Sequence, residues 1–150
     1  MSPKRGQAGA RRKANSPMQL TRAADYGLRV MVHLAKQPGH ERALLPALAK
    51  ATAAPESFLS KVLQALSRAR LIASRRGQQG GFQITGEGRR ASVKEVIEAI
   101  DGPICLNVCL DCERGCPRDL WCPVHPVWDE AQRAMLAVLS RVRIEELALR

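Results

Sequence analysis

Residues able to bind a metal or take part in redox chemistry gather in one short segment of the chain. Five cysteines lie between Cys105 and Cys122, and His125 follows three residues later. Thiolates are soft ligands that select zinc, copper(I) or iron–sulfur clusters. No secretory signal precedes the segment, so we expect reduced thiols in a cytoplasm. There, an odd and clustered set of cysteines indicates metal binding or redox chemistry rather than structural disulfides.

The cysteine spacing favours an iron–sulfur cluster over a zinc ion. A zinc site usually has a Cys-x2-Cys pair on each side of the metal. This segment has one such pair, Cys109 and Cys112, and a glycine and a proline flank Cys116. That arrangement suits a loop wrapped around a larger inorganic group, which cysteine thiolates hold and in which histidine can replace a cysteine. We expect a cluster, with zinc or unligated thiols as alternatives, and treat His125 as a candidate ligand.

The charge of the chain is divided between its two halves. The 150 residues carry 24 Lys and Arg against 14 Asp and Glu, for a net charge of +10. Residues 1–90 hold 17 basic and 4 acidic residues, a net charge of +13, and residues 91–150 hold 7 and 10, a net charge of −3. A strongly basic half indicates a polyanionic partner, most often nucleic acid. No apolar run approaches the roughly 18 residues of a membrane-spanning helix, so we expect no integral membrane protein.

The elements that position these residues predict a mainly α-helical fold with a small β-hairpin wing. Apolar spacing predicts helices over about 21–36, 46–52 and 55–70, and strands over 71–75 and 82–84 around a glycine-rich turn. That order is typical of a winged helix–turn–helix, in which the last helix of the pair enters the major groove. We expect a disordered basic arm over residues 1–17, a DNA-binding domain over 18–90, and a cluster-binding loop with dimerisation helices over 91–150.

The exposed face of the third helix and the hairpin carry the candidate DNA-binding residues. Hydroxyls, an amide and cations suit base edges and phosphates, and a basic glycine-rich hairpin suits the backbone or the minor groove. The candidates are Ser57, Ser60, Lys61, Gln64 and Arg68 on the helix, and Arg75, Arg76 and Gly77 in the hairpin. No catalytic Ser-His-Asp set or phosphate-binding Lys-Ser/Thr motif is visible, so we expect no enzyme.

Two further helices are predicted in the acidic half. Ser92 and Glu95 have the spacing of a capping box, and the helix that follows ends at Gly102 and Pro103. A longer amphipathic helix is predicted from Pro126 to about Ser140, and its apolar stripe is either core or a dimer seam. A homodimer fits helix–turn–helix proteins, which read two half-sites of a palindromic operator in double-stranded DNA. The stripe consists of Trp128, Ala131, Met135, Val138 and Leu139.

Several motifs resemble the Rrf-two family of bacterial winged-helix regulators, over roughly residues 18–147. They are Leu20-Thr21 with Asp25-Tyr26 and Leu28-Arg29, Ser57-Phe58-Leu59, the Arg76-Gly77 and Gly80-Gly81-Phe82 wing, Val96-Ile97 with Ile100-Asp101-Gly102-Pro103, and Cys116, Cys122, His125 and Trp128. The resemblance implies a homodimeric DNA-binding regulator of the bacterial nucleoid. Its iron–sulfur cluster would sense iron–sulfur status, redox state or nitric oxide.

The resemblance also implies a ligand set. Cys109, Cys116 and Cys122 match the three thiolate ligands of the family's iron–sulfur assembly regulators. The interval from Cys109 to Cys116 is one residue longer than in those regulators, so Cys112 is an alternate ligand, and Cys105 has no assigned role.

The fourth ligand sets the cluster type that the resemblance implies. His125 matches the position that goes with a [2Fe–2S] cluster, which we favour. Asp25 matches the position from which the family's nitric-oxide sensors supply a carboxylate across the dimer to a [4Fe–4S] cluster. The alternatives to a cluster sensor are a cluster-free winged-helix regulator that uses direct thiol oxidation and a small iron–sulfur carrier or assembly protein. The basic winged domain argues against a carrier.

Overall fold

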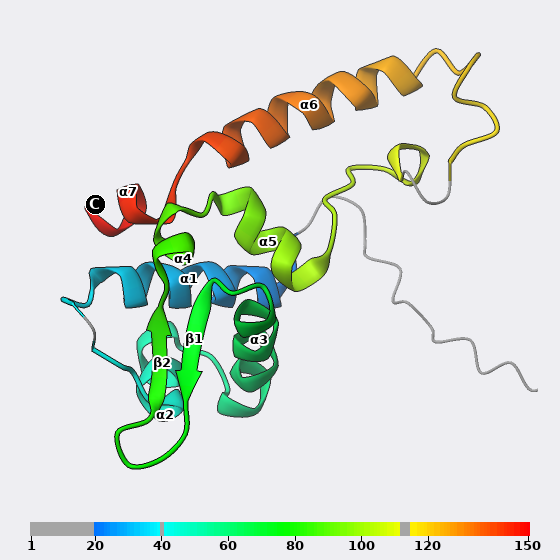
Figure 1. Cartoon of the computed structure of the whole chain (residues 1–150). Coiled ribbons are helices and arrows are strands. Elements are labelled where there is room, and N and C mark those ends of the chain that lie inside the picture. Colours follow the sequence, from blue (N-terminus) through cyan, green and yellow to red (C-terminus); the bar gives the residue numbers. More distant parts are fainter. Residues whose placement is uncertain (1–19, 40, 112–114) are drawn as a thin grey trace, which may run out of the picture.

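The computed structural model describes residues 20–39, 41–111 and 115–150, and the predicted basic arm lies outside them. Figure 1 shows helices around a two-stranded hairpin, with one long helix, α6, running along the outside of this body. The expected mainly α-helical fold with a hairpin wing is confirmed. Within the described residues, no helix is long and apolar enough to cross a membrane.

Three helices build the core of the winged domain. They are α1 (Arg22–Lys36), α2 (Leu45–Thr52) and α3 (Glu56–Arg68), close to the predicted ranges. Thr21 caps α1 by accepting a hydrogen bond from the Ala24 amide at 3.1 Å. Pro46 lies in the first turn of α2, where its missing N–H has no cost. The buried face of α3 is the predicted one and consists of Leu59, Val62, Leu63 and Leu66.

The hairpin is joined to the rest of the domain along a second edge. Strands β1 (Ile72–Arg75) and β2 (Gly81–Ile84) are antiparallel. On the other side of β2, Ala43 and Phe82 exchange two backbone hydrogen bonds of 2.9 and 2.8 Å. Gly81 has a φ of +124°, and a Cβ there would lie 2.8 Å from the Ala43 carbonyl oxygen. This position therefore requires glycine.

A short helix that the sequence did not predict follows the hairpin. Helix α4 (Gly86–Arg90) is capped by Thr85, which accepts from the Gly88 amide at 2.9 Å. Two glycines in five residues argue against a helix by intrinsic propensity. Gly88 is required by packing instead, because a Cβ would clash with the Leu71 carbonyl. Arg89 then reaches the end of α1 and donates to the Ala35 carbonyl at 2.9 Å.

The acidic half contributes three helices, and two of them pack on the winged domain. They are α5 (Val93–Asp101), α6 (His125–Arg141) and α7 (Ile144–Ala148), with a 3-10 turn, η1 (Val108–Leu110), between α5 and α6. The predicted capping box of α5 is present. Val96 of α5 and Ile144 of α7 are fully buried in the same core as α1 and α3. The residues of α6, in contrast, include none that is buried.

The predicted apolar stripe of α6 divides into two rows. Its larger residues, Trp128, Met135 and Leu139, are half-buried. Ala131 and Val138 are exposed, and with two other exposed apolar residues they form a second row along the helix. Spacings of four, three and four residues place this row on one side of α6. We call it the α6 outer row: Val127, Ala131, Ala134 and Val138.

Helices α1 and α5 are in direct contact at Gly27. A Cβ at Gly27 would overlap the Cδ1 atom of Ile100, the end of a flexible side chain that would have to change rotamer. An off-rotamer side chain costs about 0.5–1.5 kcal/mol, whereas alanine inside a helix is favoured over glycine by about 1 kcal/mol. We therefore expect Gly27→Ala to leave the free energy of unfolding within about 1 kcal/mol of the wild type, as measured by urea denaturation. The control is the same substitution in the Ile100→Val background, where no Cδ1 is displaced and the alanine should raise the free energy of unfolding by about 1 kcal/mol. Equal effects of Gly27→Ala in the two backgrounds would contradict this account of the contact.

Candidate nucleic-acid interface and thiol loop

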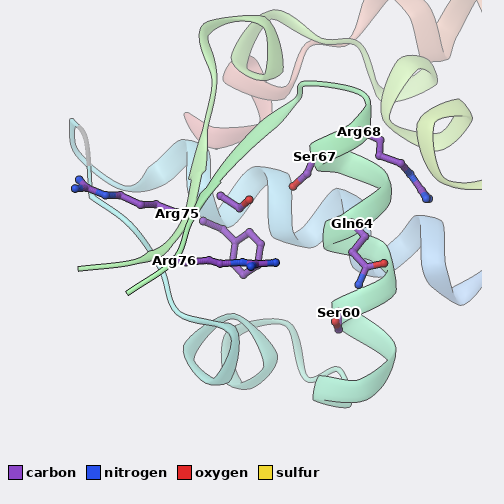
Figure 2. Close-up of a pocket in the computed structure, with 8 residues that line it drawn as sticks. Ser60, Gln64, Ser67, Arg68, Arg75 and Arg76 are labelled. Carbon is purple, nitrogen blue, oxygen red and sulfur yellow. The ribbon is translucent and has the colours of Figure 1, made fainter. Parts of the chain in front are cut away.

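A groove of about 480 Å³ lies between α3 and the hairpin. Figure 2 shows Gln64 and Arg68 along α3, with Arg76 extending toward that helix and Arg75 extending the opposite way. This opposition follows from strand geometry, because successive side chains leave a strand on opposite faces. The hairpin therefore directs the Arg76 side chain toward α3, whereas Arg75 borders the groove with its side chain extending away from α3. The lining residues are Ser60, Gln64, Ser67, Arg68, Ser74, Arg75, Arg76 and Phe82.

Most of the predicted DNA-binding residues lie in this groove. The structure brings together five of the eight, and the other three, Ser57, Lys61 and Gly77, are exposed but do not line it. Sequence reasoning missed Ser67, Ser74 and Phe82. Ser74 and Phe82 are register partners in the hairpin, so strand alternation was the signal that could have placed both on one face.

The groove is cationic. Its lining includes three arginines and no carboxylate. Within the described residues, no salt bridge involves Arg68, Arg75 or Arg76. Exposed guanidinium groups without a carboxylate partner are suited to phosphate oxygens, and the hydroxyl and amide groups beside them are suited to base edges.

The thiol loop begins with two backbone anchors between α5 and α6. The Ile104 amide donates to Oε1 of Glu98 at 3.4 Å, and the Leu106 amide donates to Oε1 of Gln132 at 2.8 Å. Glu98 also pairs with Lys94 at 2.8 Å. These contacts attach the first residues of the loop to both helices.

The described candidate thiol ligands are partly accessible to solvent and form no disulfide bonds with one another. Cys109, Cys116 and Cys122 are half-buried free cysteines, whereas Cys105 is exposed. Cys112 lies outside the described residues. Among the described residues, no three His, Cys, Asp or Glu side chains converge as a metal site would require. The three described candidate thiols therefore lie in one loop, but in this structure they do not converge on a common metal-binding position.

The last cysteine and the histidine are joined by a single turn that leads into α6, which begins at His125. The Cys122 carbonyl accepts from the His125 amide at 3.2 Å, and the Cys122 amide donates to the Arg118 carbonyl at 2.8 Å. Nδ1 of His125 is buried and has no hydrogen-bond partner. The alternate ligand Asp25 lies in the first turn of α1, and its carboxylate pairs with Arg29 at 2.8 Å.

Side-chain contacts hold both ends of α5, and the first of them ties the acidic half to the winged domain. The Thr21 hydroxyl donates to both carboxylate oxygens of Asp101, at 2.8 and 2.7 Å, so the start of α1 is tied to the end of α5. At the other end of α5, hydrogen bonds from the backbone and the hydroxyl of Ser92 hold the pKa of Glu95 below its ordinary value. Burial opposes this shift, and the charges of Arg143 and Lys94 add to it. Arg143 precedes α7 and lies 3.5 Å from Glu95.

The α2–α3 pair, the hairpin and the basic groove between them define a winged helix–turn–helix DNA-binding protein. A model of the Rrf2 family, described as an iron-dependent transcriptional regulator, matches residues 20–150. The chain therefore belongs to the Rrf2 family of transcriptional regulators. It is a DNA-binding regulator and not an enzyme, as the sequence predicted.

Individual relatives agree with this assignment. The regulator NsrR of Shouchella clausii is 30% identical over 133 residues, which cover 88% of this chain and 89% of NsrR. The solved structure of CymR, the global cysteine regulator of B. subtilis, is similar with a TM-score of 0.67 at 28% identity, covering 87% of this chain and 96% of CymR. The structure of T. potens IscR matches with a TM-score of 0.68 at 22% identity, covering 87% and 86% of the two chains, which supports the fold.

Arg76, whose side chain extends from the hairpin toward α3, should contribute to the salt dependence of DNA binding. A dimer that neutralises about eight phosphates has a log–log slope of affinity against salt near −7. We expect Arg76→Gln to weaken binding on all sequences alike and to reduce that slope by about one for each phosphate that is no longer neutralised. Fluorescence anisotropy over a salt series measures it. The control is Arg150→Gln, which removes the same charge away from α3 and the hairpin, and an equal effect of both variants would contradict the placement of the interface.

Proposed function

We propose that this regulator is a homodimer whose affinity for DNA is controlled by an iron–sulfur cluster bound at the thiol loop. Cys109, Cys116 and Cys122 would supply three thiolates and His125 the fourth ligand, with a [2Fe–2S] cluster favoured. The observation that carries the proposal is the loop itself: three half-buried free thiols end at a histidine whose buried Nδ1 has no partner. The match to a family described as iron-dependent supports it.

The residues present fit such a group. Three thiolates and an imidazole are an established donor set for iron–sulfur clusters. The buried, unpartnered nitrogen of His125 would gain a partner on ligation, which removes the free-energy cost of leaving it unsatisfied. We favour His125 over Asp25 because the Asp25 carboxylate is already paired with Arg29. Ligation through Asp25, with a [4Fe–4S] cluster, would require that salt bridge to break, and Cys112 stays an alternate thiolate.

The chain's own contacts provide a route from the loop to the DNA-reading helix. When bound, an iron–sulfur cluster supplies a one-electron redox couple whose potential depends on nearby charges and hydrogen bonds. Gln132 holds the start of the loop to α6, and Thr21 with Asp101 ties the end of α5 to α1. Because α3 packs on α1, a change in loop conformation can alter the position of the reading helix. Such coupling is typically about 1–3 kcal/mol.

We further infer that α6 is the dimer seam and that the dimer reads a palindromic operator. The α6 outer row is apolar and exposed, and no other part of the described chain covers it. A two-fold axis at the α6 seam would relate the α3 helices of the two chains and so set their spacing for two half-sites of the operator. A second candidate is a regulator that responds to thiol oxidation without a cluster, and it is favoured by the likeness to CymR, a cysteine regulator in B. subtilis whose S. aureus counterpart has been solved in an oxidized form.

Cluster binding is tested by anaerobic reconstitution of the full chain with ferrous iron and sulfide. We expect visible absorbance in the wild type and its loss in Cys109→Ser, Cys116→Ser and Cys122→Ser, because each removes a thiolate. Mössbauer spectra separate the two cluster types. The matched control is Cys105→Ser, which should keep the absorbance. If no cluster forms and the three serine variants bind DNA as the wild type does, the cluster proposal is wrong.

The seam is tested by a charge placed on the α6 outer row. We expect Val138→Arg to convert dimers to monomers in light scattering, because a buried unpaired charge is costly at an interface. The control is Ala137→Arg, one residue along the helix, on the side that carries Arg133 and Arg141. Dimers in both variants would exclude this row as the seam.

A further inference from the structure

We propose that Cys105 and Cys109 are a redox-active thiol pair that closes as a disulfide when Cys109 holds no metal. Cys105 lies outside the proposed ligand set and is the exposed thiol among the described cysteines. This inference rests on the proposed function in one respect: because Cys109 is a proposed cluster ligand, the cluster would determine when the disulfide can form. The ability of the two thiols to form a disulfide does not depend on the cluster.

The chain reverses direction between the two cysteines. It bends at Leu106 and Asn107, and η1 follows directly, with the Asn107 side chain accepting from the Val108 amide at 2.7 Å. After this reversal, Sγ of Cys105 lies 3.9 Å from the carbonyl oxygen of Leu110. Leu110 is the residue next to Cys109, so the Cys105 thiol lies against the turn that contains Cys109.

The position of Cys105 is held from both sides. The backbone amides of Ile104 and Leu106, its two neighbours, are bound by Glu98 and Gln132. The anchors restrict the backbone of Cys105, and the residue is exposed to solvent. An exposed thiol held against a turn that carries a second cysteine favours disulfide formation over further oxidation.

The reaction balances with hydrogen peroxide as the oxidant. The thiolate of one cysteine attacks a peroxide oxygen, the O–O bond breaks, and a sulfenic acid and a hydroxide form. The other thiolate attacks the sulfenic sulfur, an S–S bond forms, and the second hydroxide leaves. With two protons from the thiols, one peroxide becomes two waters and the two sulfurs lose two electrons.

Metal ligation and the disulfide exclude one another because both use the Cys109 sulfur. A closed disulfide would withdraw one thiolate from the ligand set until a reductant reopened it. Cys105 would then act as a resolving thiol, which protects Cys109 from irreversible oxidation after the cluster is lost.

The test uses the cluster-free full chain carrying Cys112→Ser, treated with hydrogen peroxide and digested with trypsin after alkylation. The peptide spanning residues 95–114 then contains Cys105 and Cys109 as its two cysteines. We expect this peptide to be unalkylated and lighter by two hydrogen atoms, and to recover both alkylation sites after reduction. Adding Cys105→Ser should abolish the two-hydrogen loss and leave Cys109 to pass to sulfinic acid.

Two results would overturn the inference. One is an unchanged peptide while a disulfide forms between Cys116 and Cys122, and the other is a mixed disulfide between two chains in place of the internal pair. Because the digest is done on cluster-free protein, neither result bears on whether a cluster binds. Reconstituted wild type tests how the disulfide and the cluster are related. We expect Cys105 and Cys109 to stay reduced until the iron is chelated. Rapid formation of the disulfide with iron still bound would show that Cys109 is not a ligand.

Discussion

The contact between α1 and α5 is the constraint on which the rest of the structure depends. Gly27 of α1 contacts the Ile100 side chain of α5, and the Thr21 hydroxyl donates a hydrogen bond to the Asp101 carboxylate where α1 begins and α5 ends. On one side of this contact lie α3 and the DNA groove, and on the other the chain leaves α5 for the thiol loop. Both halves therefore share one packed unit although their net charges differ in sign. The proposed coupling between the thiol loop and the DNA groove would have to pass through this contact.

Much of the fold was predictable because local signals agreed with the final packing. Thr21 and Ser92 cap helices as their spacing indicates, and the apolar residues of α3 face the core except for Phe58, which is exposed. Where local preference and packing disagreed, the sequence predicted no element: α4 contains two glycines, and one of them, Gly88, is explained by the proximity of the Leu71 carbonyl. Sequence periodicity predicts that α6 has one apolar face, but it cannot say which residues of that face are half-buried and which are exposed. The three-dimensional structure was needed to separate these two rows.

In the candidate DNA-binding site and the thiol loop, too, some residues were predictable from the sequence and others were not. Residue type together with the predicted order of elements and the basic charge of the first half selected Gln64, Arg68 and the hairpin arginines, which line the groove. Ser67 was missed because its hydroxyl points to a groove that exists only once α3 and the hairpin are packed together. The anchors of the thiol loop, Glu98 and Gln132, lie on two helices and bond to backbone amides. Contacts of this type have no sequence signature.

The burial of Ile144 has a consequence for how the molecule is made. This side chain is fully buried in the core that α1 begins, yet more than a hundred residues separate the two in the chain. Contacts so distant in sequence form late and slow folding. The winged domain cannot complete its apolar core until the residues of α7 have been synthesised, so the thiol loop and α6 emerge from the ribosome before the domain that reads DNA is finished. Completion of the DNA-reading domain and emergence of the thiol loop are thus ordered in time by topology alone.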